Sequence, residues 1–145
     1  MKRFIKCICI LITLSMLLVI PAMAAELPDA RSSSFFMSSS VYLYKTSSKT
    51  FEAWFDVTAV RTMDKIGASE IKIQRSTDDE NWSTVKTYSM DDYSSMIREN
   101  TAGHESYVTY TGSSGYYYRA YIELYAKDGT GIGSWDRYTA SIYIS

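Results

Sequence analysis

Short runs of alternating apolar and polar residues fill the chain from Val41 onward, and they predict an antiparallel β domain. Residues 51–60 show the alternation most clearly, with Trp54 on the polar side. A second run at 71–76 continues through the polar turn 76–81 into 82–88, which predicts a hairpin. In the first two runs, the side chains expected in the core are Phe51, Ala53, Phe55, Val57, Ala59, Ile71 and Ile73.

The C-terminal part of the chain carries its longest apolar face. A short strand is expected at 107–111 and longer ones at 116–126 and 138–144. Between the hairpin and these strands, residues 89–100 have helical spacing and a candidate N-cap in Ser89, so we expect a turn or two of helix there. The expected inward residues of the two longer strands are Tyr116, Tyr118, Ala120, Ile122, Leu124, Ala126, Tyr138, Ala140, Ile142 and Ile144.

The first 24 residues have the pattern of a signal peptide. Three basic residues precede an apolar run from Ile8 to Ile20, which is too short for a permanent membrane span, and a helix-breaking proline follows it. Cleavage is expected after Ala24, which predicts a secreted, extracellular protein with no stable membrane insertion. The rest divides into a Ser-rich flexible leader over 25–40 and one β domain over 41–145.

Cysteine and charge narrow the classes of function. Both cysteines, Cys7 and Cys9, lie in the expected signal peptide, so the exported domain has no disulfide, no thiolate nucleophile and no cysteine metal site. A cysteine-free export product favours a bacterial source. Removal of residues 1–24 takes away three basic residues and no acidic one, so the formal net charge changes from −1 to −4. Nucleic acid is therefore not an expected partner, because it requires a concentrated basic surface.

Two parts of the chain resemble fibronectin type III domains. Residues 115–122 are similar to the strand that follows the tyrosine corner, with Tyr116 in the corner position, and 126–131 are similar to the next glycine-containing loop. Residues 71–76, with Asp78 and Trp82, resemble a hairpin of bacterial members of that superfamily.

That resemblance implies an antiparallel β-sandwich of the fibronectin type III-like or immunoglobulin-like kind. The chain departs from the pattern at Asp79, which replaces a turn glycine, and at Trp54, which the family would keep in the core. As a whole, the chain also resembles small secreted proteins of Gram-positive bacteria that have no assigned function.

Alternation in the last strands predicts an exposed aromatic and charged surface. When Tyr118, Ile122 and Leu124 point inward, their neighbours point outward, and the last strand is expected to add to the same side. Aromatic rings and arginine forks are typical of binding hot spots, which favours a protein or carbohydrate partner at or outside the cell envelope. The alternative is a ladder of cross-strand pairs that only stabilises the sheet. The expected binding residues are Tyr117, Arg119, Tyr121, Tyr125, Trp135 and Arg137, with Tyr143 beside them.

No catalytic residue, metal site or cofactor is expected. His104 lies in a segment of loop composition without a nucleophile-elbow serine. Asp78, Asp79 and Glu80 gather three carboxylates in one turn, but they lack the ligand spacing and the glycine of a calcium loop. We therefore expect a non-enzymatic binding module. The alternative function is a small secreted hydrolase that uses carboxylates or His104.

Overall fold

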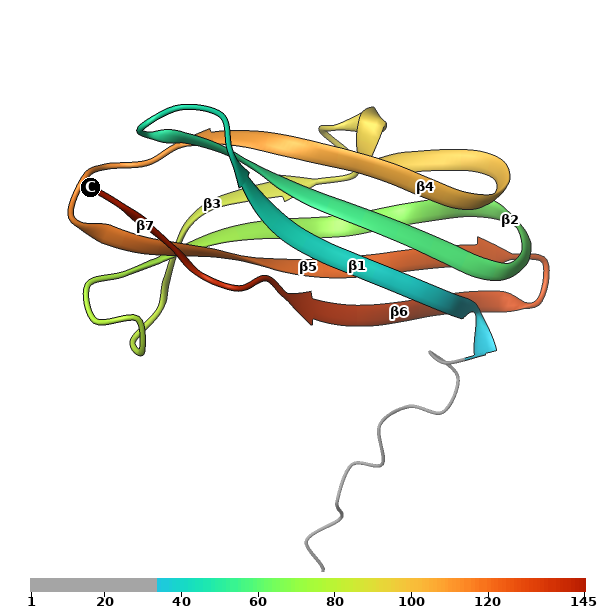
Figure 1. The fold of residues 1–145 in the computed structure, drawn as a ribbon. Coiled ribbons are helices and arrows are strands. Elements are labelled where there is room, and N and C mark those ends of the chain that lie inside the picture. The colour runs from blue at the N-terminus through green and yellow to red at the C-terminus, as the bar shows by residue number, and fades with distance from the viewer. Residues whose placement is uncertain (1–33) are drawn as a thin grey trace, which may run out of the picture.

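The computed structural model describes residues 34–145, which form one antiparallel sheet (Figure 1). A single 3₁₀ turn, η3 (Ser94–Met96), interrupts the strands, and within this range no helix is long and apolar enough to cross a membrane. The expected all-β, antiparallel class is confirmed, whereas the expected signal peptide lies outside the described residues. The strands are β1 (Phe36–Lys45), β2 (Thr50–Ser76), β3 (Ser83–Ser89), β4 (Ile97–Thr111), β5 (Tyr116–Asp128), β6 (Gly131–Tyr138) and β7 (Ile142–Ile144).

Strand β2 is 27 residues long and organises the whole sheet. Its residues 50–59 pair with β1 on one edge and β4 on the other, and its residues 65–76 pair with β5 on one edge and mainly β3 on the other. The sheet therefore curls around β2 into a half-barrel. In Figure 1, β4 and the start of β2 form the upper layer, β5 and β6 form the lower layer, and β1 runs diagonally from a start beside β6 up to the upper layer.

The expected fibronectin type III-like or immunoglobulin-like sandwich is wrong. A sandwich consists of two separate sheets packed face to face, whereas here β2 belongs to both layers and hydrogen-bonded pairing continues from β1 through β2 and β5 to β6. The tyrosine-corner assignment is also wrong. The hydroxyl that bonds the backbone upstream belongs to Tyr118, which accepts from the Ser113 amide at 2.8 Å, and not to Tyr116.

The inner face of the half-barrel is the core, and alternation identified most of it. The side chains expected to be inward in residues 51–59, at 71 and 73, and from 118 to 126 are all buried. Trp54 lies half-buried on the outer face, as its place in the alternation indicates. The largest fully buried side chains are Tyr118, Phe51, Phe55, Met63, Ile66, Ile71, Ile73, Met96, Ile122, Leu124 and Ile144.

Side chains close the seam between the two edge strands β1 and β6. The rings of Phe36 and Trp135 lie 5.8 Å apart between centroids, and Arg137 Nε donates to Ser39 Oγ at 3.1 Å. Phe35 lies against Gly133, where an added Cβ would come within 2.8 Å of its ring. Residues 36–40, which we expected in the flexible leader, are therefore part of the sheet.

The helix expected over residues 89–100 is wrong. The chain makes only the turn η3, and residues 97–100 already belong to β4. There, Ile97 and Glu99 lie opposite Gly67 and Lys65 of β2. Pairing with β2 satisfies the backbone across the bend, and this tertiary hydrogen bonding overrides the local helical spacing.

Gly67 permits this crossing of η3 over β2. A Cβ at this position would lie 1.9 Å from the carbonyl oxygen of Met96, and its φ of 153° is one that other residues rarely adopt. The close approach of Met96 to β2 therefore depends on the absence of a side chain at Gly67.

One extra residue between β6 and β7 places the side chains of β6 on the opposite face from the one that we expected. Tyr118 and Tyr121 of β5, three positions apart, lie opposite Ile142 and Tyr138, which are four positions apart. Ile142 and Ile144 point inward as expected, but the expectation for Tyr138 and Ala140 is wrong, because both are exposed. Such a bulge moves all preceding residues of the strand to the other face.

The β5–β6 hairpin is tied to β2 through Asp128. Its Oδ1 accepts from the amide and hydroxyl of Thr130 at 2.7 and 2.6 Å, and its Oδ2 accepts from Arg61 Nη2 at 2.6 Å. The hydrogen bonds from Thr130, followed by those from Arg61, lower the pKa of Asp128 to about 2.

We predict that Gly67→Ala lowers the free energy of unfolding by about 1 to 3 kcal/mol, because the new methyl group collides with the Met96 carbonyl. Gly129→Ala is the matched control, since a Cβ there meets nothing within 4 Å, and it should change stability by about 0.5 kcal/mol or less. Urea unfolding of both variants makes the comparison. Equal midpoints would show that the close approach at Gly67 is absent.

We also predict an acid-dependent role for Asp128. Because its pKa is about 2 in the folded protein against 3.8 for the ordinary group, its stabilisation is complete above about pH 4 and is lost as the pH falls towards 2. Asp128→Asn should therefore lower the melting temperature at pH 7, and the difference from the parent should shrink below pH 4. The exposed Asp64→Asn is the control. A difference that stays constant with pH would contradict this role.

Candidate binding surface

The outward residues of β5 and its neighbours form one continuous surface, which we call the β5 face. Tyr117, Arg119, Tyr121 and Tyr125 lie on it together, all half-buried, as alternation predicted. Cross-strand pairing adds residues from the adjacent strands. The added residues are Glu70, Lys72 and Gln74 of β2, Asp136 and Tyr138 of β6, and Tyr143 of β7, with Glu123 completing β5.

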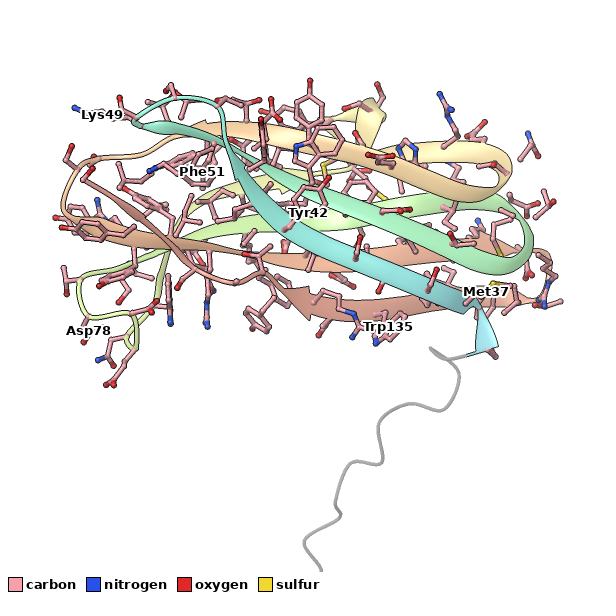
Figure 2. The ribbon with its side chains drawn as sticks, viewed as in Figure 1. Met37, Tyr42, Lys49, Phe51, Asp78 and Trp135 are labelled. Atoms are coloured by element: carbon pink, nitrogen blue, oxygen red, sulfur yellow. The ribbon has the colours of Figure 1, made fainter. Side chains whose placement is uncertain are left out.

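Trp135 and Arg137 are not on the β5 face. They lie opposite Leu124 and Ile122, which are buried, so they point to the inner side near the start of β1 (Figure 2). The Arg137 guanidinium lies 3.3 Å from the Trp135 ring centroid, and burial lowers the pKa of Arg137. The two residues therefore belong to the seam between β1 and β6. Because of the bulge after Tyr138, it is Tyr138 that lies on the β5 face, where we expected Trp135 and Arg137.

Arg119 is held by three separate segments. Its guanidinium carbon lies 4.4 Å from the ring centroid of Trp82, in the β2–β3 turn, and 4.6 Å from that of Tyr138 on β6. Its Nε donates to Gln74 Oε1 on β2 at 2.8 Å. The cation thus contacts two aromatic rings, and each such contact stabilises it by about 0.5 to 2 kcal/mol.

A shallow hollow of about 440 Å³ opens beside this clamp. The Tyr121 and Tyr138 rings lie 5.2 Å apart between centroids, and Lys72 Nζ lies 5.3 Å from the Tyr121 centroid. Burial, and then a hydrogen bond with the Asp136 carboxylate, raise the pKa of Tyr121, so its phenol stays protonated at neutral pH. The hollow is lined by Lys72, Gln74, Thr84, Tyr121, Asp136 and Tyr138.

The β5 face extends beyond this hollow in both directions. At one end, the rings of Tyr117 and Tyr143 lie 4.9 Å apart between centroids. At the other end, Tyr125 and Lys127 line a second hollow of about 370 Å³. The surface is therefore elongated and open, which suits an extended ligand.

A second group of exposed rings lies on the outer side of the upper layer. Tyr42, Trp54 and Tyr107 lie directly opposite one another on β1, β2 and β4, with centroid distances of 6.1 and 4.4 Å. Trp54 Nε1 donates to Glu52 Oε2 at 2.8 Å. These rings stack on each other, which is the geometry of a cross-strand ladder that stabilises a sheet.

The sequence context of His104 indicated a loop, but the residue lies on a strand. It lies half-buried on β4, opposite Val57, and its ring meets that of Phe55 edge-on at 5.6 Å. Its Nε2 is 2.8 Å from the carbonyl oxygen of Ser95, so this nitrogen carries the proton and donates. The imidazole therefore packs under η3.

In the acidic turn of residues 78–80, the Asp78 carboxylate accepts hydrogen bonds from neighbouring residues of the same turn. Asp78, in the β2–β3 turn (Figure 2), accepts from the Asn81 amide at 2.8 Å and side chain at 2.7 Å, and from the Ser76 hydroxyl at 2.7 Å. These bonds, with one from the Glu80 amide, hold the pKa of Asp78 well below its usual range. Asp79 adopts φ 61°, the conformation for which the resembling hairpins use glycine. Among residues 34–145, no group of three or more acidic, His or Cys side chains is placed to hold a metal ion.

The sequence matches no protein-family model, and no curated protein matches it. Among solved structures, the sporulation control protein Spo0M from Bacillus subtilis is similar to this chain, with a TM-score of 0.41 and 11% sequence identity. The match covers 70% of this chain and 47% of the Spo0M chain. The chain thus matches about half the length of Spo0M, and nothing about the activity of Spo0M is carried over to it.

We predict that mutation of the acidic turn lowers the melting temperature of the protein and that calcium leaves it unchanged. Asp78→Ala should lower the melting temperature, because it leaves the turn amides of Glu80 and Asn81 without their acceptor. Calcium at millimolar concentration should leave the melting temperature of the parent unchanged, since a ligand that binds the folded state would raise it. A rise that EDTA reverses would show that this turn is a calcium site.

Proposed function

We propose that this protein is secreted and acts as a non-enzymatic binding module, which contacts a protein or a carbohydrate at or outside the cell envelope through the β5 face. The export step rests on the signal-peptide pattern of residues 1–24. The observation that carries the binding function is the clamped Arg119, in contact with the rings of Trp82 and Tyr138.

Three properties of the β5 face support binding. Aromatic rings and arginine are the side chains most enriched at binding hot spots, because they bury a large area at low entropic cost. The rings are contiguous, and exposed aromatic side chains acquire functional meaning when they form a patch. The hollow beside Arg119 also presents polar groups that fix the orientation of a ligand.

The ladder of the upper layer serves as the comparison surface. Its three rings stack across strands without an arginine between them, and it presents Tyr42 and Tyr107 with 44 and 43% of their surface exposed. Exposure alone therefore does not separate the two surfaces. The β5 face differs by its hollow and by its fixed cation.

The test measures both binding and stability. The mature chain, fluorescently labelled, is titrated onto purified cell envelopes of the producing organism. We expect Tyr121→Ala and Tyr138→Ala each to weaken saturable binding by about 2 kcal/mol, roughly thirtyfold, as central hot-spot residues do. Both should retain most of the parent stability in urea. Tyr107→Ala, an exposed stacked ring in the other layer, is the matched control and should bind like the parent.

The opposite pattern supports the structural alternative. If Tyr121→Ala and Tyr138→Ala lower the urea midpoint and leave binding unchanged, the β5 face is a stabilising ladder. If Tyr107→Ala is the variant that loses binding, the functional surface is the upper layer and the assignment to the β5 face is wrong.

A further inference from the structure

The guanidinium of Arg119 is fixed before any ligand arrives. Trp82, Tyr138 and Gln74 come from a turn and two strands. The two rings contact the guanidinium, and Gln74 holds its Nε. A free arginine side chain carries about 2 kcal/mol of rotamer entropy, which it loses when it binds. Arg119 has lost most of that freedom on folding, so a ligand that it contacts gains affinity from pre-organisation.

The charge of Arg119 is not neutralised within residues 34–145. The ion pairs there join Arg61 to Asp128, Lys65 to Glu99 and Lys72 to Glu70. Only Nε of Arg119 donates to a protein acceptor, and the Nη1 and Nη2 groups find none in the described part of the chain. These two groups form the fork that matches the two oxygens of a carboxylate.

The hollow shares Gln74 and Tyr138 with the contacts of Arg119, and its chemistry indicates which kind of molecule carries the carboxylate. Its lining consists of an ammonium, an amide, a hydroxyl, a carboxylate and two phenols. Such a set donates and accepts many hydrogen bonds, which fits a polyhydroxylated ring. Acidic peptide motifs are instead recognised by clusters of arginines, whereas the only cation of the described residues that lines this hollow is Lys72.

Charge is distributed along the hollow in a way that suits one acid group at one end. Asp136 lies opposite Glu123, four residues along β5 from Arg119 and about 13 Å away at the rise of a β-strand. This spacing is measured along the backbone. Arg119 and Asp136 therefore contact different parts of an extended ligand, and the Asp136 carboxylate accepts hydrogen bonds from its hydroxyl groups.

We propose that Arg119 anchors the carboxylate of a sugar acid, so that the ligand of the β5 face is an acidic polysaccharide containing uronic acids. This inference rests on the binding function proposed above and narrows its ligand. Tyr121, Tyr138 and Asp136 then contact the hydroxyls and the ring of the same or the next sugar unit.

Calorimetric titration of the mature chain tests the anchor with defined probes. The probes are short oligomers of neutral sugars that carry one galacturonic or glucuronic acid at one end, and the methyl esters of both, which keep the shape and remove the charge. We expect at least one acid oligomer to bind and its ester to bind at least about tenfold more weakly, because a charge-assisted bidentate contact is lost. Affinity should also fall as salt rises.

Variants locate the contact. Arg119→Lys keeps the charge but removes the fork, and it should weaken binding of the acid oligomer by about tenfold or more. Arg98→Lys, at an exposed arginine of β4, is the matched control and should bind like the parent. The melting temperature of each variant shows whether the fold is intact, and the ester comparison needs no variant.

Three results would overturn the inference. Equal binding of acid and ester would show that no carboxylate is recognised. Tighter binding of a hexaglutamate peptide than of either acid oligomer would show that the ligand is an acidic peptide. If no oligomer that contains a uronic acid binds, uronic acids are not the ligand of the β5 face. If envelope binding still depends on Tyr121 and Tyr138 in any of these cases, the proposed binding function stands and only its ligand is wrong.

Discussion

Strand β2 passes through both layers of the molecule, and the pairing on its two edges fixes the position of β1, β3, β4 and β5. A strand that serves two layers has to bend without losing its backbone partners. Gly67 meets this requirement, because η3 approaches its Cα closely while Ile97 and Tyr125 pair with it on both edges. The half-barrel, its inner core and its outer faces all follow from this bend.

The curl of the sheet brings the edge strands β1 and β6 together. Side chains that fill the seam between them are not available to bind a ligand on the outer face. Trp135 and Arg137 are taken up by the seam with β1, so they stabilise the closure of the half-barrel. The bulge beyond Tyr138 releases that ring to the outer side, where it completes the clamp around Arg119. One inserted residue thus supplies both the seam and the binding surface.

Alternation predicted the local faces of single strands, and the structure confirms them for residues 51–59 and 118–126. It failed where long-range pairing decides. Residues 89–100 have helical spacing, but β2 pairs with Ile97 to Glu99 as a strand. The bulge near Thr139 contains no glycine or proline that would indicate it, so the side chains from Ala140 back to Trp135 were assigned to the wrong face. The likeness to fibronectin hairpins is local and contains no information on whether a strand crosses between layers.

The candidate site shows the same limit. The sequence identified Arg119 and Tyr121, because both lie on one strand with a clear alternation. It missed Trp82, Gln74 and Tyr138 as the partners of Arg119, since they come from three other segments that only the fold brings together. A binding residue on a single strand is visible in a sequence, whereas the contacts that hold it rigid are not.

Nuclear magnetic resonance of the arginine Nε–H groups measures most directly whether Arg119 is rigid and ring-stacked before a ligand binds. We predict one Nε–H signal that is absent from Arg119→Lys. Ring currents of Trp82 and Tyr138 should shift it, and the hydrogen bond to Gln74 should slow its exchange with water. An Arg119 signal with the position and fast exchange of a free arginine would contradict this prediction.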